Sequence, residues 1–160
     1  MPAKIARQKG WGWVVTQVVL LLVLLFAPLI APIYVPTWLG VLAIIIAALG
    51  IGISFVASRN LGTALTPTPV PRDSATLHTN GLYRHMRHPI YTSVLLVATG
   101  IALYRLAWSS IVLCIAVYVF FYFKSRHEEK MLLDKYQGYR KYQATTGRFF
   151  PKLGNSENNK

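Results

Sequence analysis

Two long uncharged runs near the N-terminus constrain the fold of this chain most. Residues 13–34 and 38–57 contain no charged side chain. As helices, both are long enough to cross the roughly 30 Å of hydrocarbon in a bilayer. Shorter apolar runs follow at 90–104 and 107–123. Because backbone polar groups must be satisfied internally in lipid, the runs predict an all-α integral membrane protein with about four transmembrane helices.

The composition fits a membrane setting. Of the 160 residues, 54% are hydrophobic and only 14% are charged, yet the formal net charge is +12. A nucleic-acid-binding protein can carry such a charge, but it is not usually built from long apolar runs. Lys and Arg facing anionic lipid headgroups explain the charge, so no nucleic-acid partner is expected. The single cysteine, Cys114, excludes a disulfide within the chain.

The first apolar run is interpreted as a retained helix. A cleaved signal peptide is the alternative. However, residues 13–34 are longer than a usual signal core, and Pro28 and Pro32 are poorly placed around a cleavage site. We expect the helix to bend or end near these prolines, because proline disrupts a helix interior.

The second run is rich in small residues at helical spacing. They are Ala43 with Ala47, Ala48 with Gly52, and the row Gly50, Ser54 and Ser58. Small side chains let the backbones of two membrane helices approach closely. Tight packing on another helix is therefore expected for residues 38–57, in preference to a substrate groove along the glycines.

Positive charges predict the orientation. Of the seventeen Lys and Arg residues, sixteen lie in residues 1–12, 59–89 or 124–160, and the remaining one is Arg105. Cytoplasmic segments of membrane proteins carry an excess of Lys and Arg. The distribution predicts a multi-pass protein of the inner or cytoplasmic membrane with both termini cytoplasmic.

Long polar segments lie on this predicted cytoplasmic side. The loop of residues 59–89 is proline-rich, and its turn signal Asn80-Gly81 and three prolines prevent a continuous helix: Pro67, Pro69 and Pro71. Long loops in compact domains tend to be functional.

The tail predicts a C-terminal interfacial helix. From Glu128 onward, apolar and aromatic residues recur at three-to-four spacing among basic ones, with a break expected at Gly138. Residues 1–154 are interpreted as one domain, and residues 155–160 as a disordered tail.

Two polar clusters flank the hairpin formed by the third and fourth runs. The first, GLYRHMRHPIY at residues 81–91, places arginines and histidines directly before an apolar run. Its Pro89 suits the first turn of a helix. The second, KSRHEE at residues 124–129, holds two of the five acidic residues of the chain. A positive-inside anchor explains the first cluster alone, but the two clusters together favour a binding site.

A longer pattern includes these clusters. It comprises Leu61-Gly62, Leu65-Thr66-Pro67, TLHTNGLY at 76–83, RHPIY at 87–91, Glu128-Glu129, Tyr136, Gly138, Tyr139, Tyr142 and Arg148 to Pro151. On these residues, the chain resembles the isoprenylcysteine carboxyl methyltransferase family, as a short bacterial-type member, and the related phospholipid N-methyltransferases. The resemblance implies a membrane methyltransferase that binds S-adenosylmethionine at the cytoplasmic interface. Its acceptor would be lipophilic and would enter from the bilayer.

Carried over residue by residue, the resemblance implies a cofactor site. Its members are Thr76, Leu77, His78, Tyr83, His88, Pro89, Ile90, Tyr91, Glu128 and Glu129. Two positions depart from the family pattern. Prenylcysteine enzymes carry His where this chain has Ala75, and a substrate-binding Arg where it has Lys124. The first departure concerns a cofactor contact, and the second concerns the acceptor.

The chemistry of S-adenosylmethionine suits these residues. Its ammonium requires a carboxylate such as Glu128, and its carboxylate requires donors such as those near His88. Its adenine requires apolar walls, which Leu77, Tyr83 and Tyr91 would supply. Methyl transfer needs in-line placement more than acid–base chemistry, because the sulfonium is already a good leaving group.

Lys124 and Glu128 are the predicted catalytic residues. They lie four residues apart and share a helix face. Lys124 would contact the acceptor one turn deeper in the membrane, where a cation suits a carboxylate and repels a protonated amine. Arg126 is a second candidate for acceptor binding, although it lies about 200° around the helix from Lys124. The favoured reaction is O-methylation of a lipophilic carboxylate such as a prenylated cysteine, and the alternative is N-methylation of an aminolipid.

Simpler interpretations exist for these residues. Tyr83 and Tyr91 would also suit an interfacial aromatic belt, and Glu128 would suit a helix-surface ion pair. No metal site is predicted, because the histidines lack tight ligand spacing with Cys or Asp.

Two non-enzymatic classes compete with a methyltransferase. A small transporter subunit would usually place polar residues within its helices, where this chain has almost none. A purely structural membrane protein would leave the glutamate pair and the proline-rich loop without a role.

Overall fold

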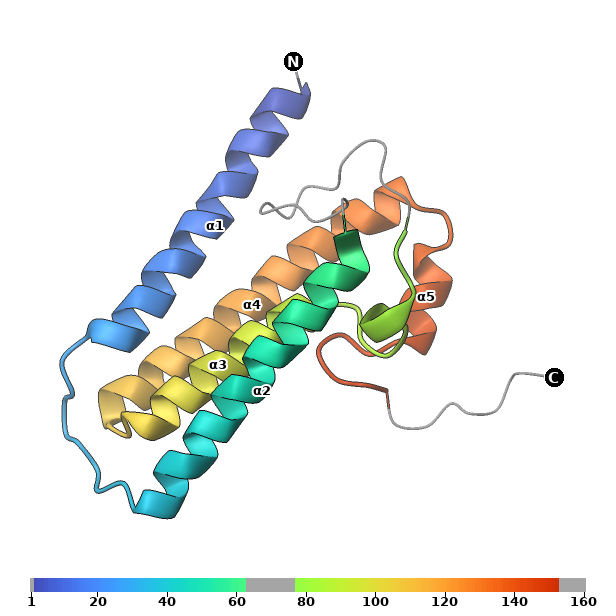
Figure 1. Cartoon of the computed structure of the whole chain (residues 1–160). Helices are drawn as coiled ribbons and strands as arrows, with labels where there is room; N and C mark the ends of the chain where they lie inside the picture. The colour runs from blue at the N-terminus through green and yellow to red at the C-terminus, as the bar shows by residue number, and fades with distance from the viewer. Residues whose placement is uncertain (1, 63–76, 153–160) are drawn as a thin grey trace.

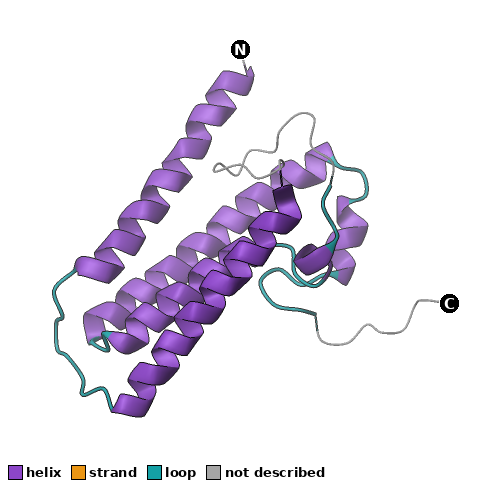
Figure 2. Cartoon of the chain, viewed as in Figure 1, coloured by secondary structure: helices purple, strands orange, loops and turns teal. Residues whose placement is uncertain are grey.

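The computed structural model describes residues 2–62 and 77–152. Within these ranges the chain forms five α-helices and a 3₁₀ turn, and no strand (Figure 2). In chain order the elements are α1 (Pro2–Phe26), α2 (Thr37–Leu61), η2 (Gly81–Arg84), α3 (Pro89–Tyr104), α4 (Trp108–Lys135) and α5 (Tyr139–Thr145).

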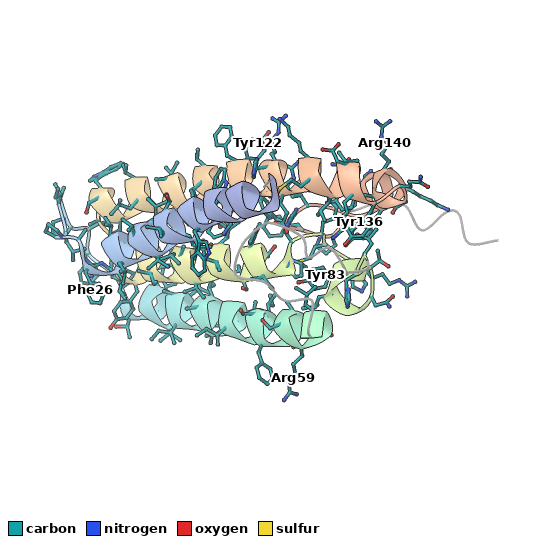
Figure 3. The ribbon with its side chains drawn as sticks, turned by 90° about the horizontal axis from the view of Figure 1, so that it is seen from above. Phe26, Arg59, Tyr83, Tyr122, Tyr136 and Arg140 are labelled. Atoms are coloured by element: carbon teal, nitrogen blue, oxygen red, sulfur yellow. The ribbon has the colours of Figure 1, made fainter. Side chains whose placement is uncertain are left out.

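Helices α1 to α4 form an elongated bundle (Figure 1). Helix α1 begins at the end of the bundle where α2 and α4 finish, and η2 and α5 gather at the same end. We call this the polar end. Figure 3 shows Tyr83 and Tyr136 there, with Phe26 at the opposite end. Segments far apart in the sequence therefore meet at the polar end.

The surface of the bundle suits lipid. Helices α2 and α4 are long and apolar enough to cross a membrane, with mean hydropathies of 2.7 and 1.6, whereas Gly10–Phe26 and α3 are shorter apolar helices. Soluble monomers rarely expose contiguous apolar surface, yet α2 carries large side chains that are more than half exposed: Ile44, Ile45, Leu49, Ile51 and Phe55. The all-α class is confirmed, and this surface fits a membrane protein.

The first helix differs from its predicted span of residues 13–34. It begins upstream at Pro2 and ends at Phe26. Pro28 explains the early end, because proline disfavours helical backbone at the residue before it. The prediction of an end near the prolines is confirmed, and the predicted extent to residue 34 is wrong.

The turn between α3 and α4 holds the end of α1. The Arg105 guanidinium donates hydrogen bonds to the carbonyls of Leu25 and Ala27. Farther along, the Ile33 N–H donates to the Leu106 carbonyl at 2.8 Å. The last carbonyls of a helix have no partner within it, so Arg105 caps α1 from a distant part of the chain.

Helices α2 and α3 pack with their backbones close together. A Cβ added at Gly50 would lie 2.7 Å from the Ser93 carbonyl oxygen, and one at Gly100 would lie 2.6 Å from that of Ala43 and 2.8 Å from Ala47 Cβ. The close approach expected from the small residues of the second run is confirmed at these positions. Helix α3 matches its predicted span closely, and α2 continues beyond residue 57.

The same expectation is wrong for Ala48 and Gly52. Both residues are exposed, and a Cβ at Gly52 would meet open space. Ala48 lies about 200° around the helix from Gly50, so this pair faces away from α3.

Helix α4 is longer than its predicted span of residues 107–123. It runs from Trp108 to Lys135, because the polar residues that follow the span are mostly good helix formers. The interfacial helix predicted from Glu128 onward is therefore partly a continuation of α4. The break expected at Gly138 is confirmed, since that residue precedes α5. One helix thus carries the whole second polar cluster.

The core lies among α1, α3 and α4. Its buried members are Leu24, Leu95, Ala98, Ala102, Val117 and Phe121. Toward the polar end, the Trp13 ring of α1 packs against Phe120 of α4, with their centroids 5.5 Å apart. Helix α1 is thereby aligned along α4 in the antiparallel sense.

Candidate functional site

The first polar cluster brings the C-terminal tail against the start of α3. Gly81 has a φ of 59°, a left-handed conformation that suits glycine, and it begins η2. After η2, the Arg87 N–H donates to the Gly147 carbonyl at 2.8 Å, and the His88 N–H donates to that of Arg148 at 3.0 Å. Two segments about sixty residues apart in sequence are thus paired through their backbones.

Glu129 is the centre of a buried group that we call the Glu129 cluster, formed with Arg87, His88, Gln143 and Arg148. The Glu129 side chain is 4% exposed, and its Oε1 lies 2.9 Å from the Arg87 guanidinium and 3.2 Å from His88 Nε2. Its Oε2 lies 2.8 Å from Arg148 Nη2 and accepts from Gln143 Nε2 at 3.2 Å. Both carboxylate oxygens are therefore occupied by the chain itself.

The charge of Glu129 is stabilised by this cluster. The residue lies beyond the apolar part of α4, which ends at Phe123. Burial alone would raise the pKa of Glu129, but hydrogen bonds from His88 and Arg148, with the charges of His88 and Arg87, lower it to about 2. A carboxylate paired in this way stays ionised at neutral pH and joins α3, α4 and the tail.

Glu128, the next residue, is far more open. Its side chain is 24% exposed. The Tyr91 hydroxyl donates to Glu128 Oε2 at 2.7 Å, and His88 Nδ1 lies 3.6 Å from the same oxygen. Because both contacts are to Oε2, the carboxylate remains reachable by a ligand.

Lys124 is buried one turn before Glu128 on α4. It is 2% exposed, and its Nζ donates to Gln17 Oε1 of α1 at 2.6 Å. Aromatic rings surround the ammonium, with centroids 5.1 Å away at Tyr91, 5.6 Å at Phe121 and 5.9 Å at Phe120. Such cation–π contacts partly replace the water that a buried ammonium has lost.

Tyr91 connects the two predicted catalytic residues. Its hydroxyl binds Glu128, and its ring face lies beside the Lys124 ammonium. The opposite side of the site is built by His88, whose ring stacks on Tyr91 with centroids 5.1 Å apart and planes at 3°. Pairwise contacts thus link these four residues between the start of α3 and the polar part of α4.

The other predicted cofactor residues, with one exception, lie within the described residues. Tyr83 is buried, and its carbonyl accepts a hydrogen bond from the Tyr142 hydroxyl. Burial, and then the charge of Glu128, raise the pKa of Tyr83 well above its usual value. Pro89 is buried in the first turn of α3, while three further residues are half-buried, namely Leu77, His78 and Ile90. Thr76 lies outside the described residues.

Arg126 does not join Lys124. It is exposed, and its guanidinium donates to the Tyr122 hydroxyl at 3.3 Å. Figure 3 shows Tyr122 projecting outward from α4. The separation around the helix that the sequence predicts is therefore present.

Sequence reasoning missed several partners in the site. Arg148 belongs to the family-like tail pattern, but no role was assigned to it. The sequence pattern around Gln143 predicts only a residue of the interfacial helix. Gln17 offered the best signal, because a polar amide inside an apolar membrane run is costly unless it has a partner.

Comparisons with known proteins agree with this geometry. The family model of phospholipid methyltransferases matches residues 38–139, from the start of α2 to the start of α5. The fold is similar to a eukaryotic intramembrane Ras methyltransferase, ICMT (isoprenylcysteine carboxyl methyltransferase), with a TM-score of 0.66 and 21% identity. That match covers 95% of this chain and 53% of the other, so the chain spans about half its length. Comparison with curated protein sequences gave no significant match. The match to more than half of the chain assigns this protein to the phospholipid methyltransferase family.

Proposed function

We propose that this protein is an S-adenosylmethionine-dependent membrane methyltransferase that O-methylates the carboxylate of a lipophilic acceptor. The observation that carries the proposal is the pairing of Glu128 and Lys124 through Tyr91. Tyr91 donates to Glu128 at 2.7 Å, and its ring centroid lies 5.1 Å from the Lys124 ammonium. An open carboxylate and a buried cation thus stand side by side. Family membership favours an enzyme over a transporter subunit or a structural protein.

The residues present fit the cofactor. Glu128 would bind its ammonium, because this carboxylate keeps a reachable oxygen and lies at the polar end. Leu77 and Tyr91, which are half-buried, would contribute apolar contacts to adenine. The remaining residues of the proposed cofactor site are Thr76, His78, Tyr83, His88, Pro89 and Ile90.

Glu129 would serve the cofactor indirectly. Its oxygens are taken by the Glu129 cluster, including His88 Nε2 at 3.2 Å. A hydrogen bond at one ring nitrogen fixes what the other nitrogen presents. Glu129 would therefore orient His88, which in turn faces Glu128.

Methyl transfer to a carboxylate depends little on general acids or bases. When bound, S-adenosylmethionine supplies a methyl group on a cationic sulfur, and the C–S bond pair stays on sulfur as the methyl leaves. The acceptor oxygen forms the new O–CH₃ bond with its own lone pair, so no proton has to move. Lys124 would hold the acceptor carboxylate by charge, and the surrounding rings would exclude water.

N-methylation of an aminolipid is the alternative, and the name of the family model favours it. An amine acceptor must lose a proton before or after attack. The ammonium of Lys124 would repel a protonated amine, whereas it attracts a carboxylate. We therefore favour the carboxylate.

The membrane arrangement is part of the proposal. We infer four spans built on α1 to α4, with both termini and the proline-rich loop on the cytoplasmic side of the inner or cytoplasmic membrane. Support comes from the basic residues that follow α4 and from Arg105 as the one cation of the α3–α4 turn. Anionic headgroups would meet exposed cations of the tail such as Arg140 and Lys141.

The test uses purified protein in lipid nanodiscs with methyl-labelled S-adenosylmethionine. Label should enter a prenylcysteine as a base-labile methyl ester and should not enter aminolipids. Lys124→Ala should abolish turnover but retain cofactor binding, and Lys124→Arg should retain or improve turnover. Label transfer to aminolipids alone, undiminished in Lys124→Ala, would replace this proposal with the N-methyltransferase alternative.

A further inference from the structure

Helix α1 contributes a polar side chain to the site although it lies outside residues 38–139, which the family model matches. Gln17 Oε1 accepts a hydrogen bond from Lys124 Nζ at 2.6 Å. We propose that Gln17 is a placeholder ligand: its amide oxygen occupies the position of an acceptor carboxylate oxygen, and the acceptor displaces it. This inference rests on the proposed role of Lys124 as the acceptor-binding residue.

The position of Gln17 is fixed by its neighbours on α1. One turn earlier, the Trp13 ring stacks on His127 of α4, with centroids 5.6 Å apart. Farther along α1, Leu24 is buried in the same core cluster as Val117 of α4. Contacts on both sides therefore hold α1 in a register that sets Gln17 opposite Lys124.

Lys124 needs such a partner when no acceptor is present. A buried ammonium without a hydrogen bond is costly. The rings of Tyr91, Phe120 and Phe121 offer π faces, and the Tyr91 hydroxyl is directed to Glu128. Gln17 supplies a lone pair to the ammonium, which stabilises Lys124 in the folded protein.

A glutamine is suited to a temporary partner. Its amide oxygen has the geometry of a carboxylate oxygen but no charge, so the positive charge of Lys124 is not neutralised. The bond from the Lys124 ammonium to the amide is already charge-assisted, but a carboxylate adds the attraction between two opposite full charges. An acceptor carboxylate should therefore replace the amide.

The surroundings allow this exchange. Gln17 is half-buried, unlike Lys124. The next residues of α1, Val18 and Val19, are about half exposed on the lipid-facing surface. A lipophilic carboxylate could thus reach Gln17 from the bilayer and pass its oxygen to Lys124 as the amide moves aside. Selection against amines follows, since a protonated amine offers no lone pair to Lys124.

The test compares Gln17→Glu with Gln17→Met. The glutamate would form a permanent internal ion pair with Lys124, and methionine removes the competing amide while keeping a similar length. Binding of a prenylcysteine is measured by calorimetry on the full chain in nanodiscs without cofactor, so that the result does not depend on turnover. The control is Gln137→Glu, which makes the same charge change at an exposed position of the polar end.

We expect Gln17→Glu to weaken prenylcysteine binding at least tenfold. Gln17→Met should bind prenylcysteine as well as the parent or better, and Gln137→Glu should bind it with the parent's affinity. Affinity for S-adenosylmethionine should be the same in all of them. Parent-like binding by Gln17→Glu would overturn the inference, as would an equal loss in Gln17→Met. If Gln17→Met fails to fold, the inference is still tested by comparing prenylcysteine binding in Gln17→Glu and Gln137→Glu. Parent protein that binds prenylcysteine but never methylates it would instead overturn the proposed function.

Discussion

Glu128 and Glu129 are adjacent in sequence but have different surroundings. Glu129 is 4% exposed and bound on both oxygens, whereas Glu128 is 24% exposed and bound on one. Successive residues of a helix point about 100° apart. One carboxylate therefore faces the tail, and the other faces the proposed ligand.

The first prediction concerns Glu128. Glu128→Gln should weaken binding of S-adenosylmethionine, because it removes the negative partner of the ligand ammonium. Loss of a hydrogen bond to a charged group costs about 1.5–3 kcal/mol, or roughly ten- to a hundredfold in affinity. Calorimetry measures the change, and Arg126→Gln is the matched control. If Glu128→Gln binds like the parent, the ammonium lies elsewhere.

The second prediction concerns Glu129. Glu129→Ala should destabilise the fold by about 3–5 kcal/mol, because it leaves buried cations without their partner. Unfolding in mild detergent measures the effect, and Glu128→Ala should show little of it. The pKa of Glu129 is lowered from 4.5 to about 2, so its contribution is complete above about pH 4.5 and is lost as the pH falls toward 2. If Glu129→Ala and Glu128→Ala were equally stable, the Glu129 cluster would not be what stabilises the fold.

Among the elements, α2 and α3 form the closest contact of the bundle. The third prediction is that Gly100→Ala destabilises the protein by about 1–3 kcal/mol, the usual cost of overpacking. The added Cβ would lie 2.6 Å from the Ala43 carbonyl oxygen. Thermal unfolding in detergent measures it. Gly52→Ala is the control, because its Cβ meets open space. If Gly100→Ala and Gly52→Ala lowered the unfolding temperature equally, the packing of α2 on α3 would not be the cause of the destabilisation.

Much at this scale was readable from the sequence. The apolar runs located all four long helices, Pro89 marked the start of α3, and Gly138 separated α4 from α5. Four-residue spacing also predicts that Lys124 and Glu128 share a face of α4, and both contact Tyr91. These features depend on local sequence, so local patterns predict them.

At the scale of the whole molecule, the fourth prediction concerns topology. Reporter fusions after residues 36 and 106 should lie on the side of the membrane opposite to fusions after residues 62 and 152. The latter pair should be cytoplasmic, because most Lys and Arg residues lie on that side. If fusions after residues 62 and 106 reported the same side of the membrane, the four-span arrangement would be wrong.

Contacts between distant segments could not be predicted. Gln17 and Lys124 are separated by 107 residues, and Arg87 and Glu129 by 42. The sequence shows that a buried lysine or glutamate needs a partner, but several residues qualify at each site. Only the packing of α1 on α4, and of the tail on α3, selects among them.

The Arg105 cap on α1 has a consequence for biogenesis. Helix α1 is synthesised before the α3–α4 turn, yet the guanidinium that satisfies the carbonyls of Leu25 and Ala27 comes from that turn. The end of α1 is therefore capped only after the later α3–α4 turn has been made. In the proposed four-span arrangement, α1 stays in the bilayer with its last carbonyls uncapped until the α3–α4 hairpin is made. The bundle then closes only after α4 has been synthesised.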